Sequence, residues 1–140
     1  MAARVERQGR CLCSAVHVTV GLEKTSVSAC HCSICRRWGG GPLMVVESTL
    51  PPQLTGEEHV HVYESSEWAE RGFCKRCGTH LFYRLKHGDF HAVPVGLFDD
   101  PDDWTFALQV FIEEKPAFYC FANDTRTLTG EELIAQFGSE

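Results

Sequence analysis

The chain has 140 residues, of which 44% are hydrophobic and 23% are charged, and its formal net charge is −6. This length and composition predict a single globular domain over residues 1–140. The acidic balance argues against nucleic acid as a partner, because phosphate binding needs an excess of Lys and Arg. No apolar run approaches the roughly 20 residues that span a bilayer, and residues 1–8 lack the apolar core of a secretory signal. We therefore expect an intracellular protein without a membrane partner, in the cytoplasm, with the nucleus as the alternative.

Short apolar stretches separated by turn residues predict a mostly β protein with antiparallel strands. Apolar and polar residues alternate at 16–20 and 59–63, which is the period of a half-buried strand. Further strands are expected at 43–46, 79–83, 90–98 and 107–112, and Pro94 would lie at an edge or a bulge.

One short C-terminal helix is predicted by the sequence Thr129-Gly130-Glu131-Glu132. Thr129 would be the N-cap and Glu132 the third helical residue of a capping box. The aromatic residues 116–121 are expected to pack on the core, with Cys120 buried among them as a small apolar side chain.

Seven of the eight cysteines lie in three tight clusters. These are Cys11 and Cys13; Cys30, Cys32 and Cys35; and Cys74 and Cys77. Eight cysteines would allow 105 disulfide pairings, but the chain is expected to be intracellular, where thiols remain reduced. Metal binding is therefore the preferred interpretation, and disulfides are the alternative.

The outer two clusters predict one closed metal site. In an extended strand, Cys11 and Cys13 would point to the same face. Cys74-x-x-Cys77 followed by Gly78 has the spacing of a zinc knuckle, in which the glycine adopts the backbone angles after the turn. Two plus two thiolates make a tetrahedral Cys₄ zinc site, which is structural in kind.

The middle cluster would then hold a second zinc ion with only Cys30, Cys32 and Cys35. Three protein ligands and one open position are the arrangement of a catalytic zinc ion. Two alternatives stay open. His31 or another histidine would close the site as Cys₃His, although His31 would point away from its neighbours' sulfurs in an extended segment, or the three thiols bind no metal.

The chain resembles the glutathione-dependent formaldehyde-activating proteins, also called the centromere-protein-V/GFA family, of the Mss4-like fold class. The resemblance covers residues 9–119 as one domain and rests on the three cysteine motifs in this order. Further matching segments are Gly9-Arg10-Cys11-Leu12-Cys13, Arg71-Gly72-Phe73-Cys74, Val95-Gly96-Leu97-Phe98-Asp99 and residues 111–118.

This resemblance implies two layers of short antiparallel strands around two zinc ions. Cys11, Cys13, Cys74 and Cys77 match the structural set, and Cys30, Cys32 and Cys35 match the catalytic set. The implied reaction is condensation of glutathione with formaldehyde to S-hydroxymethylglutathione, a carbon–sulfur lyase reaction in the synthetic direction. Ser14 departs from the family, which usually has glycine there, and Gln109 stands where many members have histidine.

Glutathione carries two carboxylates, so basic residues near the clusters are candidate clamps. These are Arg36, Arg37, Arg71, Lys75 and Arg76. Trp38, beside the glycines at 39–41, is a candidate wall of the same pocket. The alternative for these side chains is an ordinary solvated surface and an ordinary packed aromatic residue.

Two classes of function follow from the sequence. The first is an enzyme that joins a thiol such as glutathione to a small aldehyde. The second is a non-catalytic zinc-binding module, either a glutathione carrier or a protein-interaction domain. Fold resemblance alone does not choose between them, because function depends on the site.

Overall fold

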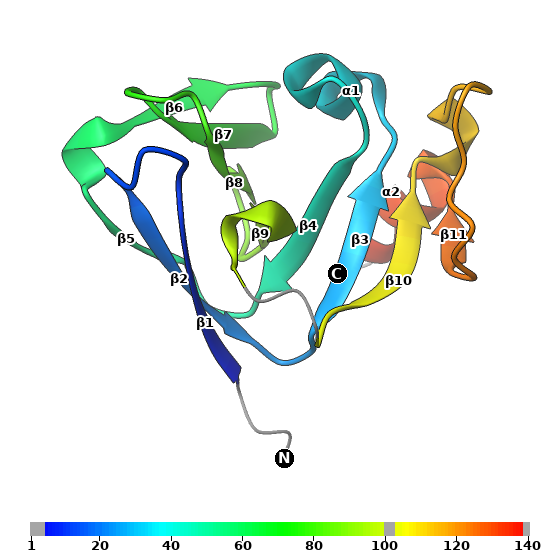
Figure 1. The fold of residues 1–140 in the computed structure, drawn as a ribbon. Helices are drawn as coiled ribbons and strands as arrows, with labels where there is room; N and C mark the ends of the chain where they lie inside the picture. The colour runs from blue at the N-terminus through cyan, green and yellow to red at the C-terminus, as the bar shows by residue number, and fades with distance from the viewer. Residues whose placement is uncertain (1–4, 100–102, 139–140) are drawn as a thin grey trace. The chain divides into compact units, whose positions relative to one another are not determined.

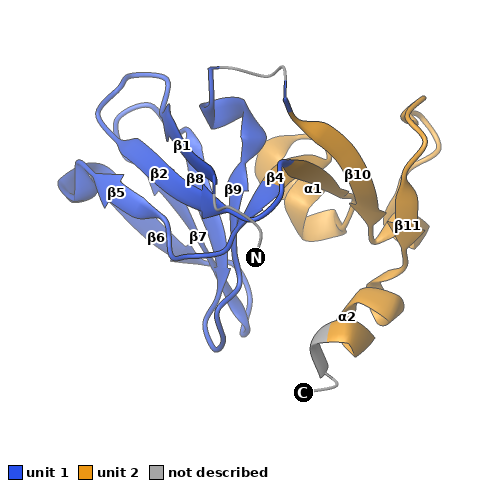
Figure 2. Cartoon of the chain, turned by 90° about the horizontal axis from the view of Figure 1, so that it is seen from below, with its two compact units in different colours: residues 1–25, 46–103 blue, residues 26–45, 104–140 orange. Residues whose placement is uncertain are grey.

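The structure, a computed structural model, describes residues 5–99 and 103–138 (Figure 1). The chain forms two compact units, and each unit is assembled from two separate stretches (Figure 2). Unit 1 comprises the described parts of residues 1–25 and 46–103, and unit 2 those of residues 26–45 and 104–140. The expectation of a single domain stays a prediction. Neither helix of the described chain has the length and apolarity that crossing a membrane requires.

Unit 1 is built from antiparallel strands. The strand β2 (His17–Leu22) lies between β1 (Val5–Arg10) and β5 (Gln53–Thr55) in a three-stranded sheet. A second group contains residues 46–48 of β4 (Leu43–Ser48), whose first three residues belong to unit 2. It continues in the order β9 (His91–Pro94), β8 (His80–Leu85), β7 (Ala69–Cys74), β6 (Val60–Glu64). The short 3₁₀ helices are η1 (Glu57–His59) and η2 (Val95–Leu97). Fully buried apolar side chains, including Val18, Val20, Leu81 and Val93, form its core.

Unit 2 contains parallel strands. The strand β10 (Thr105–Val110) pairs in parallel with both β3 (Ser26–Cys30) and β11 (Arg126–Leu128). The remaining elements are α1 (Ser33–Gly39), η3 (Ile112–Glu114) and α2 (Gly130–Gly138). Because parallel strands end at the same edge, Cys30 at the end of β3 lies opposite Val110 at the end of β10.

The predicted fold class, mostly β with a C-terminal helix, is confirmed, and strands are present at or near the expected positions. The capping box is also confirmed: Thr129 N donates to Glu132 Oε1 at 2.8 Å, and Glu132 N donates to Thr129 Oγ1 at 3.1 Å. The antiparallel expectation is wrong for β3, β10 and β11. Parallel pairing needs a long connection between the strands, and here most of unit 1 lies in sequence between β3 and β10.

Three further expectations need correction. The strand expected over 90–98 ends at Pro94, and η2 follows it. The helix α1 has no counterpart among the predicted elements. Cys120 is exposed rather than buried, because the side chains of Tyr119 and Phe121 are the ones that contact His31, with ring centroids 5.5 and 5.9 Å from that of His31.

The turn between β1 and β2 carries a strained residue. Ser14 has a φ of 67°, in the left-handed region where glycine is favoured. Its N–H donates to the Cys11 carbonyl at 3.1 Å, and its hydroxyl accepts a hydrogen bond from Arg10 Nη1 at 3.0 Å. Glycine is therefore the residue that the backbone geometry favours at this position.

Replacing Ser14 separates strain from hydrogen bonding. Both Ser14→Gly and Ser14→Ala lose the bond from Arg10, but only glycine relieves the left-handed backbone. We expect the glycine variant to be more stable than the alanine variant by about 1 kcal/mol. Urea unfolding of the metal-loaded proteins measures this difference, and an alanine variant at least as stable as the glycine variant would contradict the prediction.

Candidate metal centres

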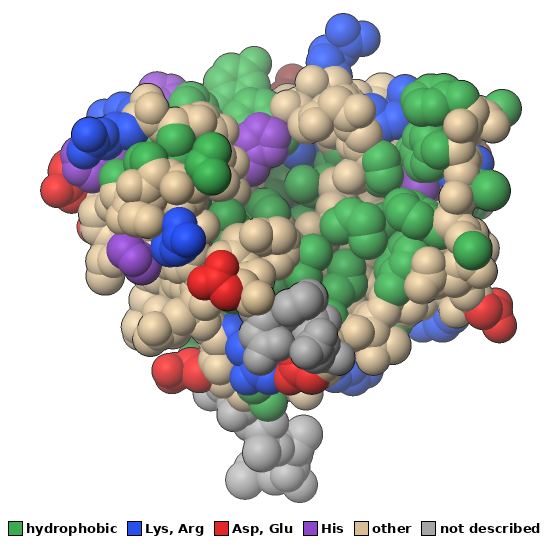
Figure 3. All heavy atoms as spheres, viewed as in Figure 1, with side chains coloured by type: hydrophobic (Ala, Val, Ile, Leu, Met, Phe, Trp, Pro, Cys, Tyr) green, Lys and Arg blue, Asp and Glu red, His purple; other side chains and the backbone are tan. Residues whose placement is uncertain are grey.

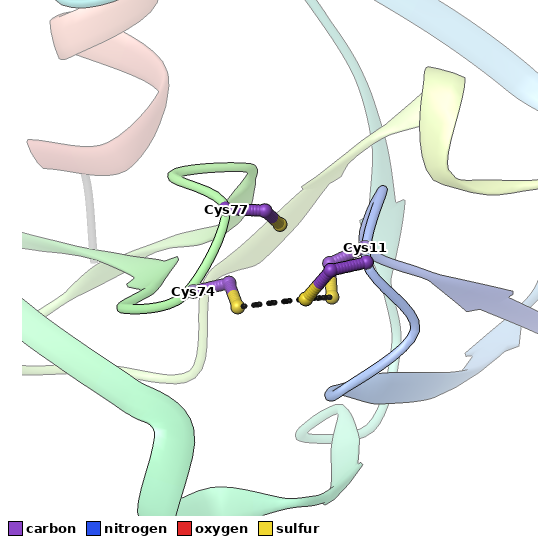
Figure 4. Close-up of side chains that lie close together, drawn as sticks. Cys11, Cys74 and Cys77 are labelled. Atoms are coloured by element: carbon purple, nitrogen blue, oxygen red, sulfur yellow. Dashed lines mark hydrogen bonds between the residues drawn. The ribbon is translucent and has the colours of Figure 1, made fainter.

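The four cysteines of the outer clusters come together in unit 1, on two turns that face each other (Figure 4). Their sulfur atoms all lie within 4.8 Å of one another. The Cys13 sulfur lies 3.7 Å from the sulfurs of both Cys11 and Cys74. Two sulfurs that share a tetrahedral ion with bonds of about 2.3 Å lie about 3.8 Å apart. The spacing therefore fits a four-coordinate metal site.

The first turn differs from the expected strand. Cys11 and Cys13 lie in the turn after β1, and the Cys11 N–H donates to the Val16 carbonyl at 3.0 Å. The expectation that these two thiols converge because a strand carries them is therefore wrong. The convergence comes from the turn closed by Ser14.

The second turn follows the predicted zinc knuckle. Gly78 has a φ of 79°, as expected for the residue after Cys77, and its N–H donates to the Cys74 carbonyl at 2.8 Å. Thr79 connects the two turns: its hydroxyl accepts from the Leu12 N–H at 3.1 Å and lies 3.1 Å from the Cys77 sulfur. This hydroxyl can therefore donate to a Cys77 thiolate.

Local hydrogen bonds favour the thiolate form at Cys77 and Cys11, whereas burial and the three neighbouring thiols raise the pKa of Cys13 to about 11. Burial opposes ionisation of Cys77, but the Thr79 hydroxyl and backbone N–H lower the pKa of Cys77 to about 5. Burial also opposes ionisation of Cys11, and the Val16 N–H, 3.3 Å from its sulfur, helps to hold the pKa of Cys11 below its ordinary value. Metals bind the thiolate form of cysteine, so the cluster is prepared for a cation.

The remaining three cysteines come together in unit 2. The sulfurs of Cys30, Cys32 and Cys35 lie within 4.8 Å of one another, and Cys35 is buried. Cys30 ends β3, Cys32 is the N-cap of α1, and Cys35 lies in the first turn of α1. The Cys32 sulfur accepts a hydrogen bond from the Cys35 N–H at 3.3 Å. The helix therefore brings the third sulfur of the motif back to the first two.

Hydrogen bonds within this cluster shift the pKa values of Cys30 and Cys32 in opposite directions. Bonds with Cys32 and Cys35 raise the pKa of Cys30 above its ordinary value, whereas bonds with Cys30 and Cys35 lower the pKa of Cys32. None of the eight cysteines, all of which are described, forms a disulfide, so the disulfide alternative is wrong.

His31, between two of these cysteines, is not part of the cluster. It is completely buried, and its ring nitrogens lie 2.7 Å from the Tyr119 hydroxyl and 2.8 Å from Gln109 Oε1. Among the described residues, no histidine, aspartate or glutamate joins the three sulfurs within the same radius. Gln109 and Tyr119 were missed as partners of this site, because they are far from the cysteines in sequence.

Two adjacent glutamates support the helices of unit 2. Glu114 accepts a hydrogen bond from the Ser33 N–H at 2.9 Å, at the start of α1. Glu113 accepts from the Gly130 N–H at 3.0 Å, at the start of α2. Phe111 precedes them with a φ of 54°, and a side chain on Gly130 would meet its ring. The segment after β10 thus fixes the helix that carries Cys35.

The predicted pocket residues have different environments. Arg36 lies in α1, and its Nε donates to the His31 carbonyl at 2.9 Å. Trp38 is half-buried in the same helix, and Arg37 is exposed. Arg71 belongs to unit 1, where it is buried with its guanidinium 5.0 Å from the Tyr83 ring centroid, while Lys75 and Arg76 are exposed. The clamp and wall roles of these residues stay predictions.

Removing the Thr79 hydroxyl tests how the first cluster ionises. The folded pKa of Cys77 lies below its ordinary value, so losing the hydroxyl raises that pKa and lets protons compete with the metal at higher pH. We expect Thr79→Val to shift the pH of half metal release upward by roughly 0.5–1 unit, with little shift for Thr79→Ser. Metal analysis after equilibration at each pH measures this, and equal release curves for valine and wild type would refute it.

Comparisons with known proteins identify the family of the chain. The sequence profile of the family described as glutathione-dependent formaldehyde-activating enzyme matches residues 6–114. An uncharacterized lyase of Schizosaccharomyces pombe is 39% identical over 130 residues, covering 92% of this chain and 95% of the relative. A putative glutathione-dependent formaldehyde-activating enzyme of Halomonas elongata is 30% identical over 135 residues, covering 82% of this chain and 86% of the relative.

A solved structure also resembles the chain. The crystal structure of a Rhodobacter sphaeroides protein aligns with a TM-score of 0.59 and 26% identity, covering 68% of this chain and 90% of that one. Because the profile matches most of the chain and the first relative covers nearly all of it, the chain belongs to the glutathione-dependent formaldehyde-activating enzyme family.

Proposed function

We propose that this protein is a zinc-dependent carbon–sulfur lyase that joins glutathione to a small aldehyde such as formaldehyde. The observation that carries the proposal is the three-sulfur cluster of Cys30, Cys32 and Cys35, to which the described residues add no fourth ligand. An all-thiolate set favours zinc among the common metals. One coordination position would then be left for a substrate atom.

The four-sulfur cluster supports a different role in the same proposal. Cys11, Cys13, Cys74 and Cys77 would hold a second zinc ion in a closed site, for which the sulfur spacing of 3.7 Å is suitable. The two turns that carry them are about sixty residues apart in sequence. A closed site of this kind stabilises the fold, because its binding free energy is also folding free energy.

A zinc ion in the open cluster would supply Lewis acidity, which lowers the pKa of a bound thiol or polarises a carbonyl group. In the reaction, the sulfur of glutathione attacks the aldehyde carbon and the carbon–sulfur bond forms. The carbonyl π bond breaks, and its oxygen takes up the proton that the thiol gives up. With formaldehyde as the aldehyde, the product is S-hydroxymethylglutathione. Neither reactant is oxidised or reduced.

The side chains of unit 2 supply a binding surface for such a substrate. Arg36 is held beside the cluster by its bond to the His31 carbonyl, and guanidinium groups bind carboxylates in a bidentate manner. Arg36 is therefore proposed as a clamp for one glutathione carboxylate, with Trp38 as a wall of the pocket.

Exchange NMR with labelled formaldehyde and glutathione tests the catalytic function. We expect the rate of interconversion between free and glutathione-bound formaldehyde to rise in proportion to the protein concentration. The Cys32→Ser variant should return the rate to the uncatalysed value, because it removes one of the three sulfurs that form the open cluster.

Metal analysis provides the control for this experiment. Wild type is expected to hold two zinc ions per chain, and Cys32→Ser one, with the closed cluster still filled and the fold retained. If wild type with two zinc ions leaves the exchange rate unchanged, the enzyme proposal is wrong. Tight glutathione binding without faster exchange would then identify a glutathione carrier.

A further inference from the structure

His31 is fixed at all four of its polar atoms. Its backbone N–H donates to the Val110 carbonyl at 3.1 Å, and its carbonyl accepts from Arg36 Nε at 2.9 Å. Its ring nitrogen Nδ1 lies 2.7 Å from the Tyr119 hydroxyl, and Nε2 lies 2.8 Å from Gln109 Oε1. These partners come from β10, α1 and the aromatic segment, so three separate parts of unit 2 converge on the residue between Cys30 and Cys32.

The Gln109 side chain determines which way the hydrogen bond at His31 Nε2 runs. Gln109 Nε2 donates to Thr125 Oγ1 at 3.0 Å, which leaves Gln109 Oε1 as an acceptor for His31. The His31 Nε2 therefore donates its hydrogen to Gln109 Oε1. The His31 Nδ1 shares a second hydrogen bond with the Tyr119 hydroxyl. Each atom of this chain of four side chains has one partner of the correct kind.

Aromatic packing holds the same ring in place. Tyr119 and Phe121 both contact His31, and Phe106 lies edge-on against Phe121 with centroids 4.9 Å apart. Hydrophobic side chains gather over β3 and β10 in the space-filling view (Figure 3). Turning the imidazole would break two hydrogen bonds and leave buried polar atoms unpaired, which is unfavourable.

We propose that His31 is a positioning residue for the metal site of Cys30, Cys32 and Cys35, and that Gln109 and Tyr119 hold its ring away from the metal. This inference rests on the proposed function of that cluster. The peptide groups on both sides of His31 lead directly to two ligands, so fixing His31 fixes the Cys30 and Cys32 sulfurs. With both ring nitrogens engaged, the fourth position stays available to substrate.

A positioning role for His31 predicts an effect on the metal site that a purely structural role does not. Groups that orient metal ligands typically change metal affinity by 10- to 100-fold when they are removed. A purely structural histidine would alter the free energy of unfolding, but it would leave the spectrum of the bound metal in the folded protein unchanged. The spectrum therefore separates the two roles.

The test uses the full chain with cobalt(II) in place of zinc, titrated with glutathione. Wild type is compared with Tyr119→Phe, with Gln109→Leu and with the double variant. Tyr63→Phe, the same chemical change on an exposed tyrosine of β6 in unit 1, is the matched control. We expect the double variant to bind its second cobalt ion at least tenfold more weakly, with altered thiolate-to-cobalt and d–d absorption and a weaker response to glutathione. The control should behave as wild type.

The outcomes separate this inference from the proposed function. A wild-type spectrum that glutathione does not change overturns the proposed function and this inference with it. A wild type that responds, together with folded variants that respond identically, overturns the inference alone. Long-range proton–nitrogen NMR of the zinc-loaded wild type needs no variant. It should show a proton on Nε2 of His31 and no zinc bound to either ring nitrogen, and a zinc-bound ring overturns the inference.

Discussion

Close approach of sulfur atoms is the constraint on which both candidate centres depend. In unit 1, the Cys13 sulfur lies 3.7 Å from two other sulfurs, one of them from a turn 61 residues away. Thiolates at such distances repel each other, and no disulfide joins them. A cation among the sulfurs removes this repulsion, and hydrogen bonds from Thr79 and Val16 favour the charged form. The metal would therefore stabilise the turns that create its own site.

The cluster in unit 2 has three sulfur atoms, one fewer than the cluster in unit 1. We relate this difference to the parallel strands of unit 2. Because β3 and β10 run in the same direction, the end of β3 with Cys30 lies beside Gln109 and Val110. The neighbouring segment supplies Glu114 to cap α1, and Tyr119 completes the environment of His31. The histidine inside the cysteine motif is thereby engaged by side chains. A strand arrangement thus explains why three ligands, rather than four, converge.

Sequence reasoning identified the parts of the site whose chemistry is local. The spacing of the cysteines predicted both clusters, Gly78 was expected to follow the knuckle, and the capping box at Thr129 was correct. The helix α1 was missed because the residue that accepts a hydrogen bond at its N-terminus is a cysteine, which is not a common capping residue. Gly40, with a φ of 86°, is an ordinary signal for the C-terminus of a helix. The partners of His31 were missed because 78 and 88 residues separate them from it, and no local pattern encodes that contact.

The central claim is that the chain holds two metal sites, one closed and one open to a thiol. Cadmium-113 NMR of the fully loaded protein, recorded before and after addition of glutathione, tests it most directly. The account predicts two resonances, of which the one lost in Cys74→Ser does not move and the one lost in Cys32→Ser shifts with glutathione. A single resonance, or two resonances that are both unchanged by glutathione, would contradict it.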